Sequence, residues 1–145
     1  MSGQPRPSLV RPTLQTPYHI DFNWWQQNER SWRVHLLGYL SPEHQQAFRG
    51  ESGEEQTFDV IDPETAEIRQ VDGLQYLLMT HYAQRSGFIT EVSSLVECIF
   101  RLFLSNGNTP LTPAEMGERL NRPAETILRT LSGGQIYRGI RPFVP

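Results

Sequence analysis

Hydrophobic residues recur at helical spacing most clearly in the last third of the chain. From Val92 to Leu104 they fall three or four positions apart, so they would lie on one face of a helix. Thr90 is a residue type that caps helix starts, and Asn106-Gly107 is typical of a helix end. The pattern therefore predicts a buried helix that begins after Thr90 and ends near Asn106.

Two shorter helices are predicted directly after this one. In Thr112-Pro113-Ala114-Glu115, the threonine is an N-cap, the proline takes the first helical position, and Glu115 can bond back to the cap. Asn121 suits the left-handed conformation of a tight turn, and Pro123 opens the next helix. Helices this short, joined by about three residues, can only cross steeply.

Aromatic residues concentrate near the start of the chain. They could stack on nucleic-acid bases, but a core is favoured because their spacing also fits helices. Ser31 can cap a helix over Trp32–Leu40, and Pro42 can open another that continues through Phe48. The aromatic residues in this segment are Tyr18, Phe22, Trp24, Trp25 and Trp32.

The middle of the chain predicts one β-hairpin followed by a helix. Strand-forming runs at residues 57–61 and 67–71 flank Asp62-Pro63, a pair that starts turns. Asp72 can then cap a helix over Gly73–Gln84, whose apolar face would include His81.

Charge is distributed unevenly along the chain. The whole sequence of 145 residues carries a net charge of −3, which is unfavourable for binding phosphates. Residues 119–145, however, hold five arginines and one acid, a net +4, whereas residues 41–72 hold nine acids and two arginines, a net −7. The chain is therefore expected to be a dipole with a basic C-terminal part and an acidic middle.

The sequence offers little support for an enzyme or a metal protein. The single cysteine, Cys98, lies at the edge of an apolar stripe and is expected to be a packing thiol. Asp62, Glu64 and Glu67 could suggest calcium, but the glycine of a calcium loop is missing and a solvated turn explains them. No nucleophile with its base, phosphate-binding glycine loop or ligand cluster was found, so we expect no catalytic residue, no metal and no cofactor.

The chain is expected to be cytoplasmic. No stretch approaches the roughly 20 apolar residues of a membrane span, and the start of the chain has prolines and arginines where a signal peptide would be apolar. Residues 1–17 are proline-rich and basic, which predicts a disordered arm. Such an arm could contact a minor groove or phosphates, although a plain disordered terminus is the simpler interpretation.

The segment Thr112–Leu131 resembles the helix-turn-helix signature of bacterial regulators. Met116 and Leu120 match the buried positions of the first helix, and Ile127 and Leu131 those of the second. Gly117 matches the small residue at the helix contact, Asn121 the turn usually given to glycine, and Arg122 departs from the apolar residue usual there. In the stretches Ile20–Trp25 and Arg122–Pro142 the chain also resembles small proteins of Chloroflexota-like bacteria, which implies no activity.

The resemblance implies a DNA-binding surface. Ala124–Thr130 would be the recognition helix; Arg129 could read guanine, Glu125 could accept from cytosine, and the glycines at 133–134 would hold phosphates. Leu128 is also expected to point outward. It could contact a thymine methyl group, form part of a dimer surface or pack on the N-terminal part of the chain. The candidate DNA-binding residues are Arg122, Glu125, Thr126, Arg129, Thr130, Arg138 and Arg141.

The expected fold is α+β and mostly helical: a disordered arm (1–17), an α+β subdomain with the hairpin (18–89) and a winged-helix-like domain (90–145). Its wing would be much shortened, with a strand at Gln135–Arg138 and a return at Gly139–Pro142. These features predict a small bacterial transcriptional regulator or DNA-docking subunit that binds double-stranded DNA.

A protein-interaction adaptor or scaffold subunit remains the alternative, because a winged helix need not bind DNA. The acidic region 41–72 could bind a protein partner, and a homodimer is left open. DNA binding requires Arg129 and Arg138 to share one exposed face, whereas an adaptor would bury some of the C-terminal arginines.

Overall fold

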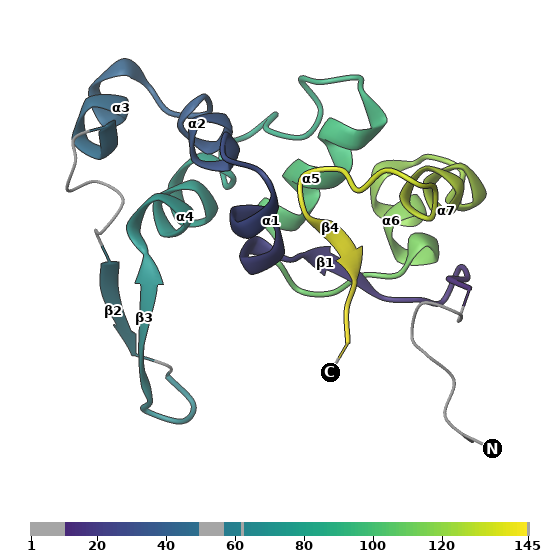
Figure 1. Ribbon diagram of the computed structural model, residues 1–145, viewed down its shortest axis with the longest axis horizontal. Helices are drawn as coiled ribbons and strands as arrows, with labels where there is room; N and C mark the ends of the chain where they lie inside the picture. Colours follow the sequence, from purple (N-terminus) through teal and green to yellow (C-terminus); the bar gives the residue numbers. More distant parts are fainter. Residues whose placement is uncertain (1–10, 50–56, 62, 145) are drawn as a thin grey trace.

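The computed structural model describes residues 11–49, 57–61 and 63–144 (Figure 1). Helices dominate the regular structure of these residues: α1 (Phe22–Asn28), α2 (Trp32–Leu37), α3 (Pro42–Arg49), α4 (Gly73–Leu77), α5 (Leu95–Ser105), α6 (Pro113–Leu120) and α7 (Ala124–Leu131). A π-helical turn, η3 (Leu78–Tyr82), continues α4. The strands are β1 (Tyr18–Ile20), β2 (Thr57–Ile61), β3 (Ile68–Asp72) and β4 (Ile140–Pro142). The mostly helical fold class is confirmed.

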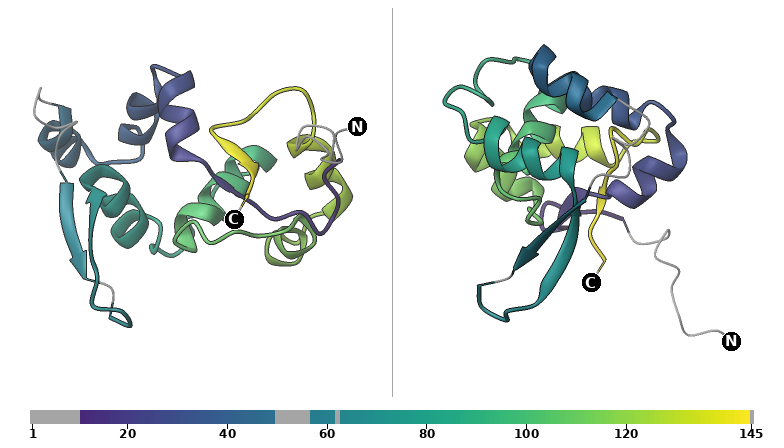
Figure 2. Two further views of the ribbon diagram at one scale, coloured as in Figure 1. Left: turned by 60° about the horizontal axis from the view of Figure 1, so that its bottom comes forward. Right: turned by 90° about the vertical axis from the view of Figure 1, so that its left-hand side faces the viewer.

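The strands form two antiparallel pairs. β2 and β3 make the predicted hairpin, in register from Thr57 opposite Asp72 to Ile61 opposite Ile68. β1 and β4 bring the two ends of the chain together. Leu111, between α5 and α6, also bridges to Tyr18, with backbone N–H···O bonds of 2.8 and 3.0 Å. The hairpin and the α6–α7 pair lie at opposite ends of the molecule's longest axis (Figures 1 and 2).

The C-terminal strand is shifted from its predicted position. Arg138 and Gly139 have positive φ angles of 50° and 75°, so the chain turns where a strand was predicted at Gln135–Arg138. The strand begins at Ile140, and its partner is β1 rather than a neighbouring strand of a wing. A methyl group at Gly139 would lie 2.8 Å from Cβ of Trp25, so the turn needs glycine to pack against α1.

Helix α5 begins later than predicted. Its N-cap is Ser94, whose hydroxyl accepts the amide of Glu97, and not Thr90. The preceding residues form a turn in which the amide of Glu91 bonds to the carbonyl of Gly87 at 2.9 Å. Arg101 of α5 donates to the carbonyl of Phe88 and to the carboxylate of Glu91, both at 2.7 Å, so a side chain from the helix holds this turn in place.

Two other helices differ from their predicted extents. α2 ends at Leu37 instead of Leu40, and Ser31 is its N-cap residue but makes no side-chain cap bond. Asp72 caps α4 as predicted, accepting the amide of Leu74 at 2.9 Å. The continuation is a π-helical turn, closed by an amide-to-carbonyl bond five residues back, and this wider turn rotates His81 to the surface instead of the predicted core.

One hydrophobic cluster includes side chains from residues 18–89 and from residues 90–145. Trp25 lies at its centre and makes edge-to-face contacts with Trp32 of α2 and Phe100 of α5. Tyr18, Trp25 and Trp32 are buried, as the core interpretation of the aromatic segment predicted. Phe22 and Trp24 pack against the cluster while partly exposed.

Residues 11–17 correct the prediction of a disordered arm up to residue 17. The amide of Thr16 bonds to the carbonyl of Thr13 at 3.1 Å, and the carbonyl of Leu14 accepts the amide of Ala114 at 3.2 Å. The carbonyl of Pro17 accepts the amide of Phe143 at 2.8 Å. The segment is therefore tied to α6 and to the end of β4; residues 1–10 lie outside the described part of the chain. Across the described ranges, no helix combines the length and the apolar character needed to cross a membrane.

Candidate nucleic-acid interface

The start of α6 has the predicted capping box. The hydroxyl of Thr112 accepts the amide of Glu115 at 3.1 Å, and the Glu115 carboxylate accepts the amide of Thr112 at 2.9 Å. The backbone hydrogen bond from Thr112 lowers the pKa of Glu115, which keeps the carboxylate charged in the first turn. The residue at which α6 begins is thus determined within its own first turn.

A tight turn places α7 directly against α6. Asn121 adopts the left-handed conformation, with φ 55° and ψ 47°, and the amide of Arg122 bonds to the carbonyl of Gly117 at 3.1 Å. A methyl group at Gly117 would lie 2.8 Å from the Arg122 carbonyl oxygen and 3.2 Å from Cβ of Ala124. Glycine is required here because the two helices approach so closely. Met116 and Ile127 are fully buried behind this corner, as predicted.

The outward face of α7 carries the predicted recognition residues in two environments. Glu125 and Arg129 are exposed, whereas Thr126 and Thr130 are half-buried. The Thr130 hydroxyl donates to the carbonyl of Thr126 at 2.9 Å, so its proton is already used within the helix. Arg129 has no ion-pair partner among the described residues. Arg129 and Glu125 are therefore the side chains most available to a partner.

Arg122 is exposed at the turn between α6 and α7. Its guanidinium approaches the backbone carbonyl of Ser93, just before α5, at 3.4 Å. The Arg122 side chain thus runs along the surface and does not occupy a buried position. This placement explains how an arginine is accommodated where the resembling family usually has an apolar residue.

Arg138 and Arg141 do not join this surface as free cations. Arg138 forms an ion pair with Glu97 of α5 and lies over the ring of Phe100, and its side chain is 29% exposed. Arg141 pairs with Asp21 at 3.1 Å and lies over the ring of Trp24. Folding pairs each of these two arginines with a carboxylate 41 or 120 residues away in the sequence, so their predicted binding of phosphates remains a prediction.

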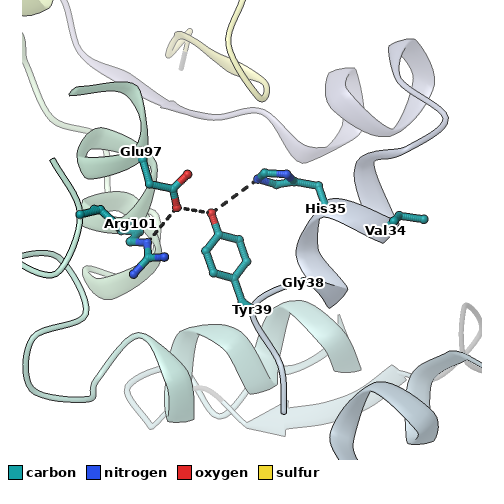
Figure 3. Close-up of a pocket in the computed structure, with 7 residues that line it drawn as sticks. Val34, His35, Gly38, Tyr39, Glu97 and Arg101 are labelled. Carbon is teal, nitrogen blue, oxygen red and sulfur yellow. Dashed lines mark hydrogen bonds and ion pairs between the residues drawn. The ribbon is translucent and has the colours of Figure 1, made fainter. Parts of the chain in front are cut away.

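Glu97 is the centre of a polar network that the sequence analysis missed. Its carboxylate accepts hydrogen bonds from Arg138, from Nε of Arg101 at 2.8 Å and from the hydroxyl of Tyr39 at 2.6 Å. The Tyr39 oxygen lies 3.5 Å from Nε2 of His35, and Figure 3 shows these side chains converging from α2, α5 and the segment after α2. The spacing of Glu97 and Arg101, four residues apart on one helix, was the only local signal for this network.

The protonation states of this network fit a structural role. Burial alone would raise the pKa of Glu97, but hydrogen bonds from Tyr39 and the two arginines outweigh it and lower the pKa to about 2. Burial, together with the bond to Glu97, raises the pKa of Tyr39, and burial lowers that of His35. Glu97 is therefore ionised at neutral pH and is a weak base. The adjoining pocket, about 440 Å³, is lined by Val34, His35, Gly38, Tyr39, Val92, Glu97 and Arg101.

A second groove runs along α7 and involves the N-terminal segment. Its volume is about 390 Å³, and its lining brings Arg11 close to Arg129 although they are far apart in sequence. Leu128 lies in the same groove with Pro12, which favours the third of its expected roles, packing on the N-terminal part. The lining residues are Arg11, Pro12, Glu125, Leu128, Arg129 and Ser132.

The remaining candidates for chemistry lie apart from this surface. Cys98 is buried, as expected for a packing thiol, and lies 3.4 Å from the carbonyl of Val92. Within the described part of the chain, no three His, Cys, Asp or Glu side chains are placed to hold a metal ion. Glu64 and Glu67 are exposed in the hairpin turn, and Asp62 lies outside the described residues.

Comparisons with family models, with curated proteins and with solved structures found no match to this chain, so its own geometry carries the functional argument.

Proposed function

We propose that the protein binds double-stranded DNA through α6 and α7, as a small bacterial regulator or DNA-docking subunit. The support is a helix-turn-helix geometry: two short helices at a glycine contact, a left-handed turn residue, and a second helix with an exposed outer face. Leu111, β1 and β4 flank this unit as the strands of a winged helix would, with β1 in the place of a wing strand. α7 would lie in the major groove.

The observation that carries the proposal is the state of the arginines at this corner. Arg129 and Arg122 are exposed, and neither forms an ion pair with a described residue. In this proposal Arg129 reads a guanine edge, Glu125 accepts from a cytosine and Arg122 holds a phosphate. Arg138 and Arg141 are left out of the proposed contact surface because each is paired with a carboxylate. The sequence-based requirement that Arg138 share an exposed face with Arg129 is therefore not met, and the proposal rests on Arg129 and Arg122.

Fluorescence anisotropy over a salt series, on random and genomic duplexes, tests the proposal. We expect saturable binding at low salt, with a negative dependence of log affinity on log salt concentration. Arg122→Ala should reduce the magnitude of this slope by about one, and Arg129→Ala should weaken binding and relax any sequence preference. Arg141→Ala is the matched control and should leave the slope unchanged. Absence of saturable binding by the unaltered protein at low salt would refute the proposal.

A protein-interaction role is the second candidate, and the hairpin supports it. Ile61 and Ile68 face each other across the strands, and each is more than 60% exposed. The same hairpin carries the exposed acids Asp59, Glu64 and Glu67, at the end of the molecule opposite α7. Such a surface fits a basic partner protein with an apolar contact.

The two candidates can be separated by one double variant. Ile61→Thr with Ile68→Thr should abolish recovery of a specific partner in cross-linking experiments, while Arg129→Ala should leave that recovery intact. Recovery that is independent of both isoleucines would contradict the hairpin as the binding surface.

A further inference from the structure

We infer that Arg11 is part of the same DNA-binding surface and holds a backbone phosphate beside α7. The inference rests on the proposed function and extends it to a residue from the opposite end of the chain. Arg11 and Arg129 line one groove, and among its described lining residues Glu125 carries the remaining charge. Two guanidinium groups against one carboxylate leave the groove with a net positive charge, which suits a single phosphate between the arginines.

The backbone that follows Arg11 is held in place, which makes Arg11 a positioned group. Pro12 follows it directly and restricts its conformation. The next residues form a turn in which the amide of Thr13 bonds to the Thr16 hydroxyl at 2.8 Å, and Leu14 bonds to the first turn of α6. The segment that carries Arg11 is thus tied to the same helix pair that would dock on DNA, so binding need not order it first.

The position beside α7 favours a phosphate over a base edge as the contact. When a recognition helix lies in the major groove, its outward residues meet the bases and the flanking segments meet the sugar-phosphate backbone. Arg11 belongs to such a flanking segment, and like Arg129 it is exposed and forms no ion pair within the described residues. It can therefore neutralise a phosphate without losing an ion pair to a described residue.

Salt-dependent anisotropy on random and genomic duplexes also tests this inference. Arg11→Ala should reduce the magnitude of the salt slope by about one, and it should weaken binding to both duplexes by the same factor. Arg11→Lys keeps the charge and should keep the slope. Arg30→Ala, which removes an exposed arginine between α1 and α2, is the matched control and should change nothing.

The outcomes distinguish the inference from the function on which it rests. If Arg11→Ala behaves like Arg30→Ala while Arg129→Ala weakens binding, Arg11 is not a contact and the proposed function stands. A slope that falls equally in Arg11→Lys and Arg11→Ala would show that charge is not what Arg11 supplies, which also overturns the inference. If the unaltered protein binds no duplex at low salt, both fall together.

Discussion

The α6–α7 corner and the closure of β1 on β4 are built by different kinds of contact. The corner depends on neighbours in sequence: Thr112 with Glu115, and Gly117 with Arg122. The closure joins segments that are far apart, through strand pairing and the ion pair of Arg141 with Asp21. This contrast shows why arginines counted along a sequence are not equivalent. Arg122 and Arg129 at the corner form no ion pair with a described residue, whereas Arg141 at the closure is paired with Asp21.

The largest expected effect is on the Glu97 network, which ties Arg138, just before β4, to α5. Glu97→Ala leaves Arg138 and Arg101 without their shared acceptor, so we expect a loss of about 3 kcal/mol in the free energy of unfolding. Urea denaturation measures this loss, and Glu118→Ala, an exposed acid on α6, is the control, expected within about 0.5 kcal/mol. A loss below 1 kcal/mol in the free energy of unfolding would mean that the Glu97 network contributes little to stability.

The same carboxylate makes stability depend on pH. The pKa of Glu97 is lowered from 4.5 to about 2, so its contribution is complete above pH 4.5 and is lost as the pH falls through 2. By pH 3 this group alone should cost about 2 kcal/mol relative to pH 6. Glu97→Gln should lack this part of the pH dependence in urea denaturation measured at both values. Identical pH dependence in the two proteins would contradict the lowered pKa.

The corner should be disrupted by a single methyl group. Gly117→Ala places Cβ 2.8 Å from a backbone oxygen, and we expect a loss of about 1–3 kcal/mol together with weaker DNA binding. At Gly133 the added Cβ would lie 3.6 Å from its nearest neighbour, so Gly133→Ala should change stability by no more than about 0.5 kcal/mol. Thermal unfolding of both variants makes the comparison, and equal effects would show that the close approach of α6 and α7 is not the cause.

The smallest effect concerns a buried hydroxyl in the closure. Tyr18 is fully buried, and its hydroxyl has no hydrogen-bond partner among the described residues. Tyr18→Phe should therefore stabilise the protein, by about 1 kcal/mol. Tyr82→Phe should instead destabilise it, because the Tyr82 hydroxyl accepts the amide of Ser41 at 3.0 Å. Destabilisation by Tyr18→Phe in urea denaturation would indicate that its hydroxyl does have a partner.

The sequence alone determined the elements whose signals are local. The capping box at Thr112, the left-handed Asn121 and the cap at Asp72 were all predictable, because each depends on backbone groups within a few residues. The hairpin was predictable for the same reason, since a turn pair stood between two strand-forming runs. Arg129 and Glu125 could also be assigned to the exposed face of α7, because helical periodicity determines the face.

The tertiary structure alone decided that β1 pairs with β4 and which arginines form ion pairs. Nothing local in Tyr18–Ile20 indicates that it pairs with Ile140–Pro142, and nothing in Arg138 indicates that Glu97 will neutralise it. The placement of Arg11 beside Arg129 could not be predicted from the sequence either. The physical reason is that a register or an ion pair between distant segments exists only after the chain has closed around its core, whereas caps and turns form between neighbours wherever they occur.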